Sequence, residues 1–139
     1  MRILFDTNVL LDALLTRAPF AKSAISLLSA VELGDLQGYL CATTITTIDY
    51  LVSKAAGRST ANDAVDQLLQ IFEVAPVDRR VLQGALALEF TDFEDAVLYV
   101  SALFVGVDAV VTRDKKGFTL ARIPILSPEE LVALLSQSQ

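Results

Sequence analysis

Residues 2–15, with the sequence RILFDTNVLLDALL, decide the fold of this chain. The apolar run at residues 3–5 is typical of a short buried strand, and apolar residues then recur at helical spacing. The segment predicts a strand from Arg2 to Phe5 and a helix from about Asn8 to Leu15. Asp6 lies between the two, at the strand end, and this is the edge at which parallel α/β sheets bind their ligands.

Working outward from this segment, apolar strand patterns alternate with helical patterns along the rest of the chain. The further predicted strands are Tyr39–Ala42, Phe72–Ala75, Ala109–Thr112 and Ile123–Leu126. Capping residues predict helix starts at Thr43 or Thr44, Ser59 or Thr60, Asp78, Thr91 and Ser127. We therefore predict one α/β domain over residues 1–139, with a mostly parallel twisted sheet of four to five strands, helices on both faces, and a frayed tail from residue 135.

Composition narrows the possible functions. The chain has 139 residues, of which 53% are hydrophobic, and this is enough for one core. No apolar stretch reaches the roughly 18 residues of a membrane span, and the start of the chain lacks a cleaved signal, so we expect a cytoplasmic protein without membrane attachment. The absence of histidine excludes Ser/His triads and most zinc sites, and the single cysteine, Cys41, is expected in the core.

The net charge of −6 argues against a broad basic face for nucleic acid. It does not exclude local phosphate contacts, because Arg79-Arg80 and Lys115-Lys116 remain available. The acids themselves are informative. Asp6 and Asp114 follow predicted strands, while Asp49 and Asp95 lie in hydrophobic helical patterns. Carboxylates that converge in an apolar fold repel one another unless cations lie between them, so these four predict a divalent metal site.

Each of these acids also has a purely structural explanation. Asp6 and Asp92 suit helix caps, Asp49 suits a helix rim, and Asp114 suits the first position of a type I turn that ends at Gly117. Asp12 is expected to be a solvated helix residue. Other residues at the same edge are expected to assist: Asn8, Asp92 and Thr112 as supporting groups, and Arg113 as a contact to substrate phosphate.

Three motifs together resemble the PIN-domain family, including its VapC-like toxin nucleases. They are FDTNVLLD at residues 5–12, DFEDA at 92–96 and VTRD at 111–114. The likeness continues through RAPF at 17–20 to IPILSPEE at 123–130, and so covers nearly the whole chain. The resemblance implies a Mg²⁺- or Mn²⁺-dependent ribonuclease whose catalytic metal ligands match Asp6, Asp49, Asp95 and Asp114.

The chain departs from the family pattern at two positions. The second acid in the family is often glutamate, whereas this chain has Asp49. The most similar subgroup tends to carry asparagine in place of Asp114 and aspartate in place of Gly117, whereas Asp114 matches the threonine-x-aspartate pattern of other members of the family.

The resulting hypothesis is an endoribonuclease in which one or two bound ions activate water for attack on a phosphodiester. Its expected partners are RNA, an antitoxin-like protein and a second copy of the chain. A catalytically silent PIN-like interaction module is the main alternative. A phosphoacceptor receiver domain is a weaker one, because the segment at residues 72–76 lacks an acceptor aspartate and the segment after residue 125 lacks a lysine.

Overall fold

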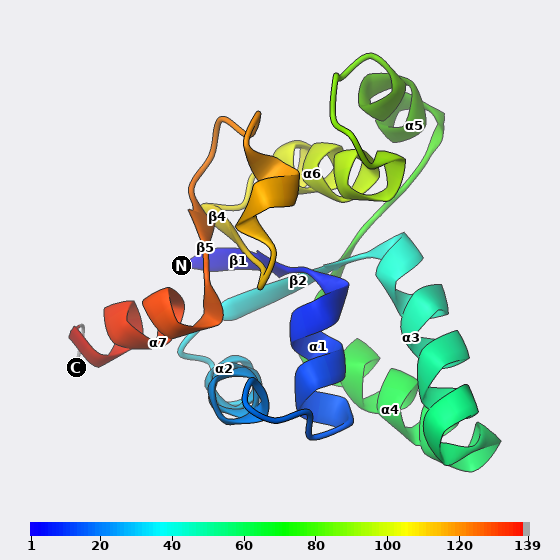
Figure 1. Ribbon diagram of the computed structural model, residues 1–139, viewed down its shortest axis with the longest axis vertical. Helices are drawn as coiled ribbons and strands as arrows, with labels where there is room; N and C mark the ends of the chain where they lie inside the picture. The colour runs from blue at the N-terminus through cyan, green and yellow to red at the C-terminus, as the bar shows by residue number, and fades with distance from the viewer. Residues whose placement is uncertain (138–139) are drawn as a thin grey trace.

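The apolar run at the N-terminus forms the central strand of a five-stranded sheet in the computed structural model, which describes residues 1–137 (Figure 1). The strand order is β3-β2-β1-β4-β5, and all four pairings are parallel. The strands are β1 Arg2–Phe5, β2 Gln37–Cys41, β3 Glu73–Ala75, β4 Ala109–Val111 and β5 Ile125–Leu126. The predicted parallel α/β fold is confirmed.

Helices cover both faces of this sheet, because strand side chains alternate between the faces. Ile3 and Phe5 of β1 belong to one hydrophobic core, and Leu4 belongs to the other. The first core is closed by α1 Thr7–Leu14, α2 Ala21–Glu32, α3 Ala42–Ala56, α4 Arg58–Ile71 and α7 Pro128–Gln137. The second is closed by α5 Arg79–Leu86 and α6 Phe93–Val105, which lie on the opposite side of the sheet in Figure 1.

The helix starts test the predicted caps. Asp78 accepts from the backbone N–H of Val81 at 3.1 Å, and Ser127 and Glu130 form the expected reciprocal capping box, so both caps are confirmed. The cap of α6 is Asp92 rather than Thr91. The threonine cap predicted for α3 and the serine or threonine cap predicted for α4 are wrong. Helix α3 begins at Ala42 and α4 at Arg58, and neither has a side-chain cap.

The structure can also be compared with the predictions for the C-terminal tail and for the single cysteine. Helix α7 continues through Gln137, beyond the start of the tail predicted from residue 135, and residues 138–139 lie outside the described part of the chain. Cys41 is buried, as expected of a core residue. Among residues 1–137 no helix is long and apolar enough to cross a membrane.

Gly38 in β2 allows close packing against side chains of the first core. A Cβ atom at this position would lie 2.6 Å from two ring atoms of Phe72, whose ring packs edge to face on Phe5 with centroids 5.1 Å apart. Gly38→Ala is therefore expected to lower the free energy of unfolding by about 1–3 kcal/mol, although alanine suits a strand better than glycine. Urea denaturation measures this cost. The same substitution is expected to cost less in a Phe72→Leu background, and an equal cost in both backgrounds would contradict the steric cause.

Candidate active site

The strand order places a crevice at the carboxyl ends of β1 and β4. From β1 the chain builds outward to β2 and β3, and then returns to add β4 and β5 on the other side. Ligands of parallel sheets bind at such a switch point. The backbone N–H of Asp6 donates to the carbonyl of Val111 at 2.9 Å, so the residues that follow the two strands are held side by side.

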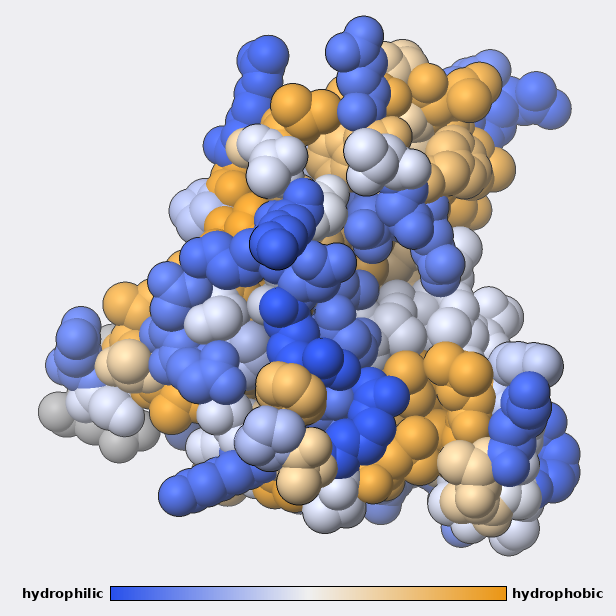
Figure 2. Space-filling view, in the orientation of Figure 1, coloured by the Kyte–Doolittle hydropathy of each residue, from blue (hydrophilic) through white to orange (hydrophobic). Residues whose placement is uncertain are grey.

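A cavity of about 430 Å³ opens at this point and is called the acid cavity below. Figure 2 shows hydrophilic side chains gathered over the middle of this face, bordered by apolar areas. The cavity is lined by Asp6, Thr7, Asn8, Leu11, Arg17, Thr43, Thr44, Thr47, Asp92, Glu94, Asp95, Leu98, Arg113 and Asp114. Three of the four predicted ligands, Asp6, Asp95 and Asp114, are therefore brought together.

Asp6 is the most enclosed of these carboxylates, with 8% of its surface exposed. One oxygen, Oδ1, accepts from the backbone N–H of Thr7 at 2.7 Å, and the other, Oδ2, accepts from the buried hydroxyl of Thr112 at 2.8 Å. Asp6 is thus the N-cap of α1 and also a fixed carboxylate at the cavity. The capping explanation and the functional explanation hold for the same residue.

Asp95 and Asp114 approach each other above Gly117. A Cβ atom built on Gly117 would lie 2.6 Å from Oδ2 of Asp95 and 3.8 Å from Oδ2 of Asp114. Both carboxylates therefore lie within 4 Å of the point where a side chain at position 117 would begin.

The predicted supporting residues also lie at this site. The amide of Asn8 donates to Asp6 at 3.5 Å and to Thr112 at 3.4 Å, both long hydrogen bonds, and its oxygen accepts from the backbone of Arg113. The Thr112 hydroxyl accepts from the backbone N–H of Asp114 at 3.0 Å, which links the two acid-bearing segments. Asp92 caps α6 through the backbone N–H of Asp95.

The structure does not bring Asp49 together with the other three predicted ligands, and its role in the site stays a prediction. It lies outside the acid cavity and forms an ion pair with Arg58 at the surface. The reason is helical geometry. The cavity-facing residue Thr47 is two positions earlier on α3, and two residues of an α-helix turn through about 200°, so Asp49 points away from the cavity.

Sequence reasoning missed three kinds of residue here. Glu94 lines the acid cavity from α6, and its Oε1 accepts from Thr47 at 3.4 Å. The threonine hydroxyls of α3 face the same space, a pattern readable from their spacing at 43, 44 and 47. Asp12, expected to be solvated, has 0% of its surface exposed and pairs with Arg17 and Arg113. Its position after two leucines of the buried helix face was the available signal.

Repulsion and burial perturb the acids of the cavity. Burial raises the pKa of Asp95 to about 7, with further contributions from Asp6, Asp92, Asp114 and Glu94. Burial also raises the pKa of Asp6, against the hydrogen bonds from Thr112 and Thr7. In the absence of a cation, the folded state therefore holds protons that the unfolded chain releases.

This proton uptake predicts the pH dependence of stability. The ordinary pKa of Asp95 is 3.8 and the folded value is about 7. Both states are protonated below the lower value, and between the two values the unfolded chain ionises first. The free energy of unfolding of the metal-free protein is thus expected to fall as the pH rises from about 4 to 7. Urea titrations in EDTA measure this slope, and Asp95→Asn is expected to flatten it. An unchanged slope in that variant would contradict the assignment.

Comparisons with known proteins show the family to which this fold belongs. A family model described as PIN domain matches residues 2–116. The chain belongs to the PIN-domain family. The predicted resemblance is confirmed over most of the chain, and the fold is a single PIN domain.

Solved structures of low sequence identity share the PIN fold. VapBC2 from Rickettsia felis, bound to a promoter DNA fragment, aligns with a TM-score of 0.69 and 14% identity, covering 91% of this chain and 98% of that one. A toxin–antitoxin complex from Klebsiella pneumoniae aligns at 0.68 and 22%, covering 91% and 97%. VapC20 of Mycobacterium tuberculosis, a sarcin–ricin loop cleaving toxin, aligns at 0.63 and 14%, covering 78% and 86%. No curated protein sequence matches this PIN domain.

The chemistry of the acid cavity suits a hard cation. The side chains in it that can hold a metal ion carry carboxylate, hydroxyl and amide oxygens, without histidine or cysteine, and oxygen ligands are what Mg²⁺ and Mn²⁺ prefer. Within residues 1–137 no three acidic side chains are close enough to share an ion as they stand. Burial, together with repulsion from the neighbouring acids, nevertheless raises the pKa of Asp95, and a bound cation would favour its ionised form. The donor set of this PIN domain therefore fits a divalent metal ion.

A substitution at Gly117 tests how closely the Asp95 carboxylate is packed in this site. An added methyl group would displace the Asp95 carboxylate, because the two would be 2.6 Å apart. Gly117→Ala is expected to lower any RNA cleavage by about 10- to 100-fold, since misplacing a reacting group by about 1 Å has an effect of that size. Its melting temperature is expected to change little, because a flexible side-chain end moves. Gly84→Ala in α5, away from the cavity, is the control. Full activity of Gly117→Ala would show that the position of Asp95 is not critical.

Proposed function

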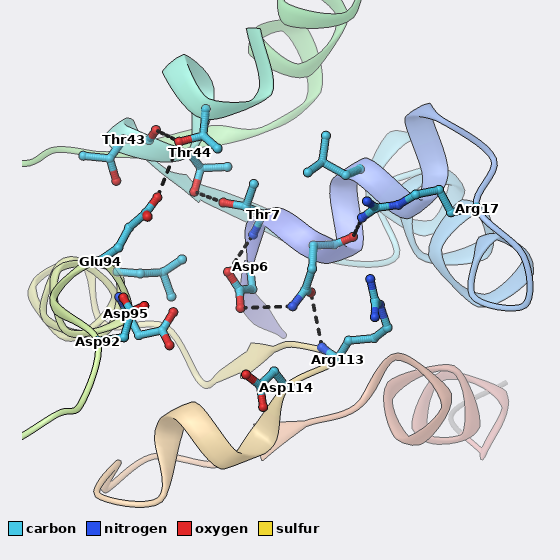
Figure 3. Close-up of a pocket in the computed structure, with 14 residues that line it drawn as sticks. Asp6, Thr7, Arg17, Thr43, Thr44, Asp92, Glu94, Asp95, Arg113 and Asp114 are labelled. Atoms are coloured by element: carbon cyan, nitrogen blue, oxygen red, sulfur yellow. Dashed lines mark hydrogen bonds between the residues drawn. The ribbon is translucent and has the colours of Figure 1, made fainter. Parts of the chain in front are cut away.

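We propose that this PIN domain is a divalent-metal-dependent endoribonuclease that hydrolyses RNA phosphodiester bonds with Mg²⁺ or Mn²⁺. The observation that carries the proposal is the convergence of Asp6, Asp95 and Asp114 in one open cavity at the carboxyl ends of β1 and β4 (Figure 3). The PIN-domain family and the VapC20 likeness support an RNA substrate.

The proposed role of each residue follows from its position in the cavity. Asp6 and Asp95 would be the principal ligands and Asp114 the third, with Glu94 in reach of the same space. A bound divalent ion would stabilise charge on phosphoryl oxygens and make water a stronger nucleophile for cleavage of the P–O bond. Thr112 donates to Asp6 and holds its carboxylate in one orientation, as outer hydrogen bonds commonly do for ligands. The cap from Asp92 fixes the first turn that carries Asp95.

The biological role proposed is that of a toxin in a toxin–antitoxin pair, acting in the cytoplasm. The structural neighbours include toxin–antitoxin complexes, which supports an antitoxin-like partner. Apolar side chains are also exposed on and near α5, with Leu86 at 76% and Phe93 at 51%. Such surface suits either an antitoxin helix or a second copy of the chain. Light scattering of the isolated protein distinguishes a homodimer from a monomer.

The experiment that tests the enzyme activity uses the purified protein and a labelled single-stranded RNA. Cleavage is expected with Mg²⁺ or Mn²⁺ and not in EDTA, and it is expected to return when the metal is restored. A protein that binds Mn²⁺ but leaves a broad set of RNAs intact would favour the catalytically silent interaction module instead.

A further inference from the structure

A buried carboxylate holds two arginines together beside the acid cavity. Asp12 accepts from Nε of Arg17 at 2.9 Å through Oδ1. It accepts from Nε of Arg113 at 2.7 Å through Oδ2, and from Nη2 of the same residue at 3.2 Å. Arg17 and Arg113 both line the cavity, and Figure 3 shows them across it from Glu94 and Asp95.

Asp12 has one more arginine partner than its burial requires. A buried carboxylate needs compensation by a cation and hydrogen bonds, and the bidentate contact from Arg113 supplies both. The second arginine gives the cluster of Asp12, Arg17 and Arg113 a net charge of about +1, by simple addition of formal charges. This positive group lies at the wall of a cavity otherwise rich in acids.

The two guanidinium groups are also held in place. Arg113 packs over the ring of Phe20 at 4.0 Å, and Nη2 of Arg17 donates to the carbonyl of Asn8 at 3.4 Å. Free arginine side chains lose much rotamer entropy when they bind a ligand, and side chains that are already fixed lose less. The pair is therefore preorganised for a ligand.

Both arginines keep donors for such a ligand. The hydrogen bonds of Arg17 and Arg113 use Nε and Nη2, and Nη1 of each donates to no other residue in the part of the chain that the structure describes. Paired guanidinium donors match the oxygens of a phosphate group. In a cavity whose acids suit a cation for phosphodiester cleavage, a neighbouring phosphate of the same strand is the anion that fits best.

We propose that Asp12 is a positioning residue that holds Arg17 and Arg113 as a fixed pair, and that this pair binds a backbone phosphate of RNA beside the scissile bond. The proposal rests on the ribonuclease function proposed above. It assigns Asp12 an effect on RNA binding although its buried carboxylate does not line the cavity.

Binding is measured by fluorescence anisotropy of a labelled single-stranded RNA in the cleavage-deficient Asp6→Asn background with Mn²⁺ present. Arg17→Gln and Arg113→Gln are each expected to weaken binding about tenfold, the size of a lost charge-assisted hydrogen bond. The slope of log K against log salt is expected to fall by up to about 0.7. Arg58→Gln, which removes an arginine paired with Asp49 outside the cavity, is the matched control and should bind as the parent does.

The Asp12→Asn variant distinguishes two effects of Asp12 on RNA binding: its positioning of the arginines and its negative charge. Removing a negative charge near RNA would tighten binding if charge alone mattered, whereas loss of the bidentate anchor for Arg113 is expected to weaken it about fivefold or more. Circular dichroism and thermal melting check the fold of this variant. If it does not fold, the two arginine variants decide the question, because each leaves Asp12 with one remaining partner.

Four results would overturn the proposal. In the first, the arginine variants bind RNA as Arg58→Gln does. In the second, Asp12→Asn binds RNA more tightly than its parent. If the wild-type protein cleaves RNA, either result rejects the proposal for Asp12 and its two arginines and leaves the ribonuclease function in place. A wild-type protein that neither binds nor cleaves RNA rejects the ribonuclease function as well. Arginine-dependent binding of an acidic peptide without RNA binding would assign the pair to a protein partner.

Discussion

Replacing Asp6 by asparagine is expected to lower metal-dependent RNA cleavage by about 1000-fold. Asparagine has the same shape: its Oδ1 can still accept from the backbone N–H of Thr7, and its Nδ2 can donate to the Thr112 hydroxyl in place of the bond that Asp6 accepts, so the fold should persist. It lacks the charge that holds a cation, and charge stabilisation by a catalytic metal is worth several kcal/mol, with each ~1.4 kcal/mol equal to a factor of ten in rate. Initial rates on a labelled RNA in Mn²⁺ measure the loss, and circular dichroism checks the fold.

Asp49→Asn is the matched control for this loss. The substitution is chemically identical, but Asp49 pairs with Arg58 outside the acid cavity, so cleavage should stay near the wild-type rate. Surface ion pairs of this kind contribute about 0–1 kcal/mol, and little destabilisation is expected. An Asp49→Asn variant as inactive as Asp6→Asn would contradict the position of Asp49 described above.

Mn²⁺ is expected to raise the melting temperature of the wild-type protein at pH 8, and Asp95→Asn is expected to lose most of this increase. A ligand that binds only the native state at about 100 times its dissociation constant adds ~2.7 kcal/mol, or about 5–10 °C for a domain of this size. At pH 8 the Asp95 carboxylate is ionised, above its pKa of about 7, and its repulsion with Asp6 is relieved by the cation. Differential scanning calorimetry with and without Mn²⁺ measures the increase.

The same variant has a second expected effect of opposite sign. Without metal at pH 8, Asp95→Asn should be more stable than the wild-type protein, because it removes a half-buried charge that Asp6, Asp92 and Asp114 repel. Asp49→Asn should retain the full response to Mn²⁺. If Asp95→Asn kept that response and gained no metal-free stability, the carboxylates would not share an ion.

Most of the fold is encoded in local patterns. The run at residues 3–5 predicts the central strand because side chains buried on both faces of a parallel sheet are uniformly apolar. Asp78 and Ser127 predict helix starts because a cap acts through the nearest N–H groups. Thr43 and Ser59 failed as caps for a related reason, since β2 leads directly into α3 at Ala42 and Gly57 already supplies the turn before α4.

The site is less visible in the sequence because it depends on rotation and long-range pairing. Asp6 and Asp114 follow strands, so topology alone brings them to one edge. The direction of Asp49 depends on a two-residue offset from Thr47 along α3, which an apolar pattern does not resolve. Burial of Asp12 required knowing that Arg113, from the far end of the chain, would pair with it.

Anomalous diffraction from crystals soaked in Mn²⁺ tests the central claim most directly. A manganese peak is expected in the acid cavity, within coordination distance of Asp6 and Asp95 and close to Asp114, with those side chains drawn together relative to the metal-free protein. A clear map with no manganese among these carboxylates at millimolar Mn²⁺, or with the ion bound elsewhere, would contradict the metal-dependent nuclease.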